Sequence, residues 1–195
     1  MMIVASMAMA CGSSKAPNPA AQGETKLPVS AVSRYLPLID GTIWAYDAED
    51  DETGNRGMFV TKARRLPGPR FSLTSGQTAH TLEVRGDGIA HAETNAYVLK
   101  APLSAGAEWP GERGSVVRVG ALDRVVEVPA GKFVGCVDTI EELRGAPGKD
   151  PLRRVTATYC PEVGIVLLHA EAWQNGRHAG ERATLRSFGK PVQIQ

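Results

Sequence analysis

The sequence of 195 residues is poor in several features on which functional assignments usually depend. Its formal net charge is +1, so it lacks the basic excess that binding to the DNA backbone or to anionic lipid requires. No apolar stretch reaches the roughly 20 residues that a membrane-spanning helix needs. Aromatic residues make up 6% of the chain, and there are three cysteines and four histidines. The sequence therefore argues against a nucleic-acid-binding module and offers few catalytic or metal-ligating side chains.

Motifs for catalysis and cofactor binding are also lacking. No G-x-S-x-G sequence presents a nucleophile, and no glycine-rich phosphate loop precedes a helix. The cysteines are not accompanied by C-x-x-C or paired-histidine spacing, which argues against zinc. Glu141 and Glu142 are adjacent, so on a strand they point to opposite faces and cannot act together as acid and base. We predict neither an enzyme nor a bound cofactor or metal.

The histidines offer only weak candidates for a site. His80 and His91 flank a turn at residues 85–88, and a symmetric hairpin would place His91 opposite Leu82 and His80 opposite Glu93. A metal site there is less plausible than a solvated strand face. A turn at Asn175-Gly176 predicts that His169 faces Arg182 and that His178 faces Trp173. The acidic residues of 47–52 lack the spacing of an EF-hand, so we interpret them as a hydrated loop tip.

What the sequence does contain begins with its first eleven residues, MMIVASMAMAC. A short apolar run is typical of a signal peptide, and the small residues Ala8 and Ala10 precede Cys11. This ending resembles the lipobox of bacterial lipoproteins, in which a signal peptidase cuts before a cysteine that then carries acyl chains. A leucine is usual in place of Ala8, and a basic segment usually precedes the apolar run. We interpret residues 1–10 as a signal peptide that is incomplete at its start and Cys11 as the lipidation site; the alternative is an ordinary thiol.

The segment that follows has the composition of a tether. Residues 12–26, GSSKAPNPAAQGETK, show no hydrophobic periodicity and bury too little area to offset the entropy of ordering them. We therefore expect a lipidated cysteine and disordered tether at 11–30 and a single domain at 31–192. Anchor, tether and domain in this order predict a lipoprotein of the bacterial cell envelope, held in the outer membrane by its acyl chains.

The sequence of the domain predicts an all-β fold. A short helical turn is possible at 31–36, where Pro37 would stop it. Beyond it, short alternating or β-branched segments are separated by Gly, Pro, Asn and Asp. Because the connections are short, successive strands should be antiparallel, and we predict a meander that forms an open barrel or sandwich. The expected strands are 42–48, 57–65, 70–74, 78–84, 89–93, 96–100, 115–119, 124–128, 133–144, 152–160, 164–173 and 177–188.

An internal repeat points to the core. The pattern P-L-x-x-G-x-x-W occurs from Pro37 to Trp44 and again from Pro102 to Trp109. We interpret it as a lead-in, a glycine turn and a tryptophan that anchors the next strand, although chance in a chain rich in Gly and Pro is an alternative. Large aromatic side chains stabilise a core strongly when buried. The predicted core aromatics are Trp44, Tyr46, Trp109, Phe133, Tyr159 and Trp173.

Two cysteines are placed to form a disulfide. Cys136 and Cys160 lie on consecutive predicted strands, and they are opposite each other if the hairpin is symmetric about Gly148. Opposed residues at a non-hydrogen-bonded pair have Cα atoms about 4.5 Å apart, within disulfide reach. The bond would persist in the oxidising compartment of an exported protein. The alternatives are two separate thiols or a register shifted by one residue.

Three motifs carry a family resemblance. They are P-L-x-x-G-x-x-W-x-Y from Pro37 to Tyr46, V-P-A-G-x-F from Val128 to Phe133, and Y-x-P-x-V-G-x-V from Tyr159 to Val166. Together they resemble a group of uncharacterised exported bacterial lipoproteins with all-β domains. The resemblance covers most of the domain and implies its fold and compartment. Its motifs consist of turn residues and core aromatics, so it implies no catalytic residues.

We therefore expect a non-enzymatic lipoprotein whose β domain binds or scaffolds an envelope protein or lipid. One alternative is a carrier or chaperone for lipid or lipoprotein, which requires a large apolar cavity. A scaffold would instead fill its interior with Trp44, Trp109, Phe133 and Trp173. The second alternative is a hydrolase, which requires a cleft where a Ser or Asp lies within hydrogen-bond reach of a histidine.

Overall fold

The computed structural model describes residues 31–146, 150–174 and 176–189, so Cys11 and the tether lie outside it. Within these residues the chain forms strands and one short 3-10 turn, η1 (Glu112–Gly114). No helix of this part of the chain is long and apolar enough to cross a bilayer. The strands are β1 (Ile43–Asp50), β2 (Arg56–Arg65), β3 (Arg70–Ser75), β4 (Thr78–Arg85), β5 (Gly88–His91), β6 (Tyr97–Lys100), β7 (Glu108–Pro110), β8 (Val116–Val119), β9 (Arg124–Val128), β10 (Gly131–Arg144), β11 (Pro151–Cys160), β12 (Gly164–Gln174) and β13 (Arg177–Gly189).

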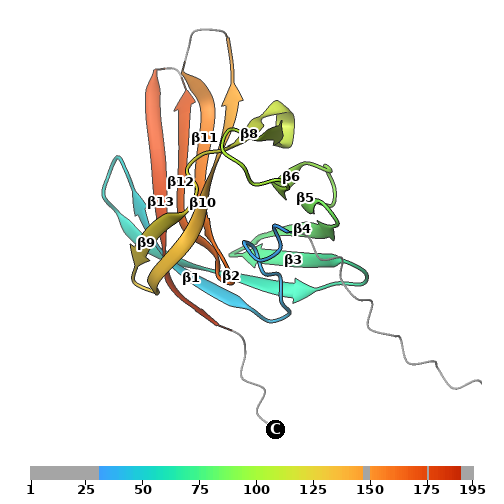
Figure 1. The fold of residues 1–195 in the computed structure, drawn as a ribbon. Coiled ribbons are helices and arrows are strands. Elements are labelled where there is room, and N and C mark those ends of the chain that lie inside the picture. Colours follow the sequence, from blue (N-terminus) through green and yellow to red (C-terminus); the bar gives the residue numbers. More distant parts are fainter. Residues whose placement is uncertain (1–30, 147–149, 175, 190–195) are drawn as a thin grey trace, which may run out of the picture.

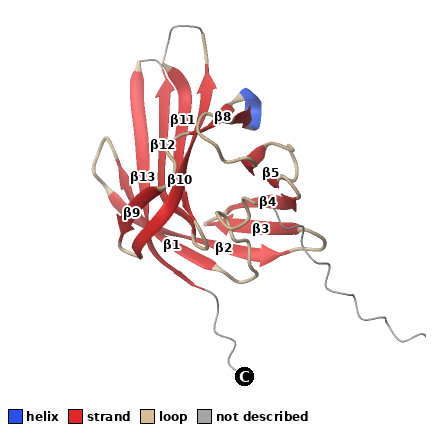
Figure 2. Cartoon of the chain, viewed as in Figure 1, coloured by secondary structure: helices blue, strands red, loops and turns tan. Residues whose placement is uncertain are grey.

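The strands form one antiparallel sheet that curls into a nearly closed barrel. Their order is β6-β5-β4-β3-β2-β1-β13-β12-β11-β10-β8-β7, and β9 pairs with the first part of β10 beside this path. Figures 1 and 2 show the long strands β10 to β13 as one wall and β1 to β5 curving away from it. The predicted all-β, antiparallel architecture is confirmed. One local expectation differs, because β7 was not among the expected strands; residues 31–36 form the expected turn, in which Tyr35 N donates to Val32 O at 2.9 Å.

A tryptophan joins the two ends of the sheet. The end strands β6 and β7 have no backbone ladder between them, but the indole Nε1 of Trp109 donates to the carbonyl of Tyr97 at 3.0 Å. Trp44 makes the equivalent bond elsewhere, from Nε1 to Val163 O at 2.7 Å. The backbone supports both indoles in the same way, because Gly41 and Gly106 of the repeat have φ of 76° and 75°. The repeat therefore forms the same local structure twice: a glycine turn followed by a tryptophan whose indole donates to a backbone carbonyl.

The interior is filled by three clusters of buried apolar side chains. The first is built around Trp44, Tyr46 and Leu185, and the third around Trp109 and Val119. The second receives side chains from the turns before β1, which Figure 1 shows in blue against β3 and β4. The buried apolar residues of this second cluster are Val32, Leu36, Leu38, Phe71, Leu82, Val84, Ile89, Leu99, Ala157 and Tyr159.

Four of the six predicted core aromatics are buried: Trp44, Tyr46, Trp109 and Tyr159. Phe133 is half-buried and packs against the first cluster and edge-to-face with Phe188. The assignment of Trp173 to the core was wrong. It lies one pair from the end of the β12–β13 ladder, where its ring contacts His178 and the guanidinium of Arg154 instead of apolar side chains. Trp173 is two residues from Glu171 on a strand without a bulge between them, so it lies on the same face as the ion pairs of Glu171 and Arg154 and not on the core face.

The hairpin of β10 and β11 has the predicted register. Val137 pairs with Tyr159 and Asp138 with Thr158, and both pairs are equidistant in sequence from position 148. Cys136 and Cys160 follow as the next pair, and they form a disulfide with Cα atoms 4.2 Å apart. Both cysteines are fully buried within the first cluster.

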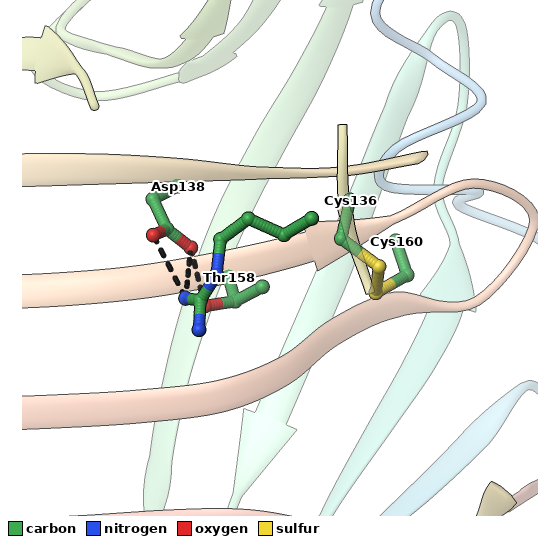
Figure 3. The surroundings of a disulfide bond; sticks show 5 residues. Cys136, Asp138, Thr158 and Cys160 are labelled. Carbon is green, nitrogen blue, oxygen red and sulfur yellow. Dashed lines mark hydrogen bonds and ion pairs between the residues drawn. A yellow bond between two sulfur atoms is a disulfide. The ribbon is translucent and has the colours of Figure 1, made fainter. Parts of the chain in front are cut away.

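A polar cluster lies two residues along each strand from the disulfide (Figure 3). Nη1 of Arg124 donates to both carboxylate oxygens of Asp138, at 2.9 and 2.8 Å, and Thr158 Oγ1 donates to the same carboxylate at 2.6 Å. Charge-assisted bonds of this kind are stronger than neutral ones. Together with the disulfide they fix β9 against the β10–β11 hairpin.

Candidate binding pocket at the open side of the barrel

A cavity of about 100 Å³ lies inside the barrel, behind the junction of β6 and β7. It has room for about three water molecules at roughly 30 Å³ each. Side chains from both sides of the junction line it, so it belongs to the side where Trp109 bonds to the backbone of Tyr97. The lining residues are His91, Tyr97, Val98, Gly111, Glu112, Val117, Thr139, Glu141, Val155, Ala157, Tyr159 and Leu168.

One wall of this pocket carries an unsatisfied histidine. Nδ1 of His91 is buried without a hydrogen-bond partner, and it lies 3.8 Å from Oε1 of Glu112. That separation is too long for a hydrogen bond. Glu112 accepts a bond from Thr94 Oγ1 at 2.9 Å. Within the described ranges no lysine or arginine forms an ion pair with Glu112.

A second carboxylate, Glu141, enters the pocket from β10. Its Oε1 accepts a bond from Ser115 Oγ at 2.6 Å and lies 3.3 Å from Nη2 of Arg153. Gly111 allows η1 to approach this closely, because a Cβ at that position would overlap Ser115 Oγ and lie 3.2 Å from Glu141 Oε1. The close approach is what places Glu112 and Glu141 around one small volume.

The floor of the pocket is a buried phenol. Burial, together with the nearby charge of Glu141, raises the pKa of Tyr159 far above its ordinary value. A phenol with a raised pKa stays protonated at every physiological pH. Tyr159 therefore contributes a neutral hydroxyl, and the negative charge of the pocket comes from the two glutamates.

A second internal cavity, of about 90 Å³, lies on the other side of Leu168 and is lined mainly by apolar side chains, including Leu36, Trp44 and Phe59. Typical ligand pockets are about 300–1,000 Å³. Neither cavity can hold an acyl chain. The interior is thus filled in the way expected of a scaffold, although Trp109 and Trp44 rather than Trp173 do the filling.

The weak metal candidates are only partly brought together. His91 faces Leu82 as predicted, and the rings of His80 and His91 are 5.7 Å apart. The expected pairing of His80 with Glu93 was wrong, because β5 ends at His91 and the chain turns before Glu93; His80 faces Leu73 instead. Nowhere in the part of the chain that the structure describes could three His, Cys, Asp or Glu side chains hold a metal ion together.

The acidic segment 47–52 is tied down rather than open to a cation. Asp50 caps its own turn, where its Oδ1 accepts bonds from Thr53 N and Thr53 Oγ1, both at 2.7 Å. These bonds from Thr53 lower the pKa of Asp50. Asp51 pairs with His169 at 2.7 Å and with Arg182 at 3.0 Å. The segment therefore closes the β1–β2 hairpin onto β13.

The pair of Asp51 and His169 meets the distance requirement of the hydrolase alternative. His169 faces Arg182, as predicted, and its side-chain partners among the described residues are Asp51 and Glu171, both carboxylates. Asp51 also lies 3.0 Å from Arg182, so its carboxylate is engaged in ion pairs. The arrangement is better described as one end of an ion network on the outer face of the sheet.

Glu142 is the most strongly held member of this outer face. Its side chain is 10% exposed, and its two oxygens lie 2.6 Å from Arg144 Nη2 and 2.8 Å from Arg154 Nη2. The bonds from Arg144, and to a smaller extent those from Arg154, lower the pKa of Glu142. Glu141 and Glu142 lie on opposite faces, as predicted.

The lowered pKa of Glu142 predicts a pH dependence of stability. A carboxyl whose pKa is lower in the folded than in the unfolded state stabilises the fold above its unfolded pKa of about 4.3, and this contribution is lost as pH falls through the folded value. Glu142→Gln should therefore cost about 1–2 kcal/mol at pH 7 and much less near pH 3. Urea denaturation of the wild-type protein and the variant at pH 7 and pH 3 measures the loss of unfolding free energy at each pH. An equal loss at the two pH values would contradict the prediction.

Comparison with solved structures gives two structural neighbours. No family model matches the sequence, and no curated protein matches it. A candidate exported protein with a YmcC-like fold from Bacteroides fragilis has a TM-score of 0.48 and 13% identity, with 78% of this chain and 97% of that chain covered. A candidate lipoprotein from Parabacteroides distasonis has a TM-score of 0.44 and 13% identity, with 80% and 98% covered. Likeness of this degree says nothing about what this barrel binds.

Proposed function

We propose that this protein is a lipoprotein of the bacterial cell envelope, anchored through Cys11 in the outer membrane, whose barrel serves a non-enzymatic binding role. The observation that carries the proposal is the buried Cys136–Cys160 disulfide. Disulfides persist in oxidising compartments and are rare in the bacterial cytosol. The resemblance of residues 8–11 to a lipobox supplies the means of attachment, and both observations point to the same side of the cytoplasmic membrane.

The two other functions have less support. A lipid carrier needs a large apolar cavity, whereas the internal cavities are about 100 and 90 Å³. For a hydrolase, the side chains paired with His169 among the described residues are Asp51 and Glu171, and Asp51 is also held by Arg182. The pocket at the open side has an unpartnered nitrogen on His91 and, on Glu112, a carboxylate with which no lysine or arginine of the described residues pairs, in a volume of about 100 Å³. Such a site favours recognition of a small group over chemical turnover.

Metabolic labelling of cells with a clickable palmitate analogue tests the anchor. We expect label on the wild-type protein, recovered in the membrane fraction, and complete loss of label in Cys11→Ala. The matched control is Cys136→Ala with Cys160→Ala, which removes two cysteines but leaves Cys11 in place, and it should retain the label. An unlabelled wild-type chain that carries an intact leader would overturn the proposal.

A further inference from the structure

We propose that the pocket behind the β6–β7 junction binds a short primary alkylammonium group. The proposal rests on the binding role proposed above and names the class of ligand. The argument starts from the charge of the pocket. Its titratable lining residues are His91, Tyr97, Glu112, Glu141 and Tyr159, so the lining contains no lysine or arginine. Glu141 is paired with Arg153, whereas no lysine or arginine of the described residues pairs with Glu112, so Glu112 is the main source of attraction for a cation.

Among cationic ligands, the hydrogen-bonding groups of the pocket favour one with several N–H donors. Oε1 of Glu112 and Nδ1 of His91 are 3.8 Å apart, so a donor between them can bond to both. The histidine nitrogen is buried and unpartnered, which is costly unless a ligand or water occupies the site. An ammonium group offers three donors, so it can satisfy Glu112, the neutral form of His91 and a third acceptor together.

The apolar lining of the cavity determines which group can be attached to the ammonium. Val98, Val117, Val155, Ala157 and Leu168 line the remainder of the cavity. A hydrated metal ion gains nothing from such walls, whereas a short alkyl stem is desolvated favourably. A volume of about 100 Å³ accommodates an amine with about three carbons and is too small for an aromatic amine.

The source of the ammonium group is either a free small amine or a lysine side chain presented by another protein. Both would enter at the β6–β7 junction, where the end strands share no backbone ladder. A lysine would need its backbone to remain outside the cavity. The probes below separate the two sources.

The test is a titration of the full chain with its disulfide formed. Binding is monitored by the NMR chemical shifts of the backbone amides and the histidine rings. The probes are propylammonium, Nα-acetyl-lysine methylamide, 1-propanol and propionate at matched ionic strength. We expect saturable shifts at His91, Gly111 and Glu112 with propylammonium and none with the alcohol or the carboxylate. Saturation by the lysine derivative at equal or lower concentration identifies a side chain as the source, and saturation by propylammonium alone identifies a free amine.

Three variants make the result specific. Glu112→Gln should weaken binding tenfold or more, because a hydrogen bond to a charged acceptor is lost. Glu49→Gln removes the same charge on β1, where Glu49 pairs with Arg56, and should change the affinity less than twofold. Ala157→Val adds two methyl groups to the cavity wall and should weaken binding without altering the charge. Each variant is checked for native thermal unfolding first.

Equal weakening by Glu112→Gln and Glu49→Gln would overturn the proposal, since it would show attraction to net charge only. The absence of saturable shifts with both amines, or binding of propionate instead, would do the same. The palmitate experiment is independent of these outcomes. Lipidation without amine binding would overturn the ligand class alone, and amine binding without lipidation would overturn the anchor alone.

Discussion

Trp44→Ala is expected to lower the free energy of unfolding by about 4 kcal/mol, the cost of truncating a fully packed large aromatic. Trp44 is 3% exposed, lies in the first core cluster, and has its indole against the backbone of Gly164. The substitution also removes the donor to the buried carbonyl of Val163. Urea denaturation followed by far-UV circular dichroism measures the change.

Two further tryptophan variants separate the causes of this loss. Trp173→Ala is the matched control, because the side chain is half-buried at a hairpin tip, and it should cost about 1 kcal/mol. Trp44→Phe keeps most of the apolar volume but leaves the Val163 carbonyl unpaired, which should cost about 1–3 kcal/mol. Equal losses for Trp44→Ala and Trp173→Ala would contradict the different burial of the two residues.

Removal of the disulfide is expected to have an effect of similar size. Cys136→Ala with Cys160→Ala should lower the free energy of unfolding by about 3 kcal/mol, because the bond closes a loop of 24 residues in the unfolded chain. The measurement is urea denaturation of the wild-type protein and the double variant without reductant.

Both cysteines are fully buried, so their replacement by alanine removes two packed sulfur atoms as well as the bond. Reduction of the wild-type protein breaks the bond but keeps the sulfur atoms, so it separates the two effects. The wild-type protein in reductant should lose most of the same 3 kcal/mol, while the double variant should be unaffected by it. A wild-type protein whose stability does not change once both thiols are shown to be free would contradict the prediction.

The sequence predicts much of the fold because the signals involved are local. Alternation and turn residues identify twelve of the strands. The assumption that the hairpin is symmetric about position 148 gives the β10–β11 register, which places the two cysteines opposite each other. β7 was not predicted because its three residues are too few to show alternation, although the repeat marks Trp109 as the anchor of a strand. Trp173 was assigned to the core on residue type alone, and residue type does not report on which face of the strand a side chain lies.

The candidate pocket was less predictable. Alternation indicates that Glu141 and Glu142 face opposite ways, but it does not say that Glu141 faces a cavity. The approach of Glu112 depends on the junction of β6 with β7, which are ends of the sheet and share no ladder. A pairing of this kind leaves no periodic trace. The available signal was Gly111, where the absence of a side chain allows η1 to lie against Ser115.

The pairing of the first strand with the last one has a consequence for biogenesis. β1 forms its ladder with β13 from Ile43 opposite Gly189 onward, so the sheet joins segments almost 150 residues apart. A nascent or translocating chain that emerges from its N-terminus first cannot complete the sheet until its final segment is released. Until then, the edge of β1 that β13 would cover exposes unpaired backbone groups. A chain truncated before β13 should therefore depend on chaperones for its solubility.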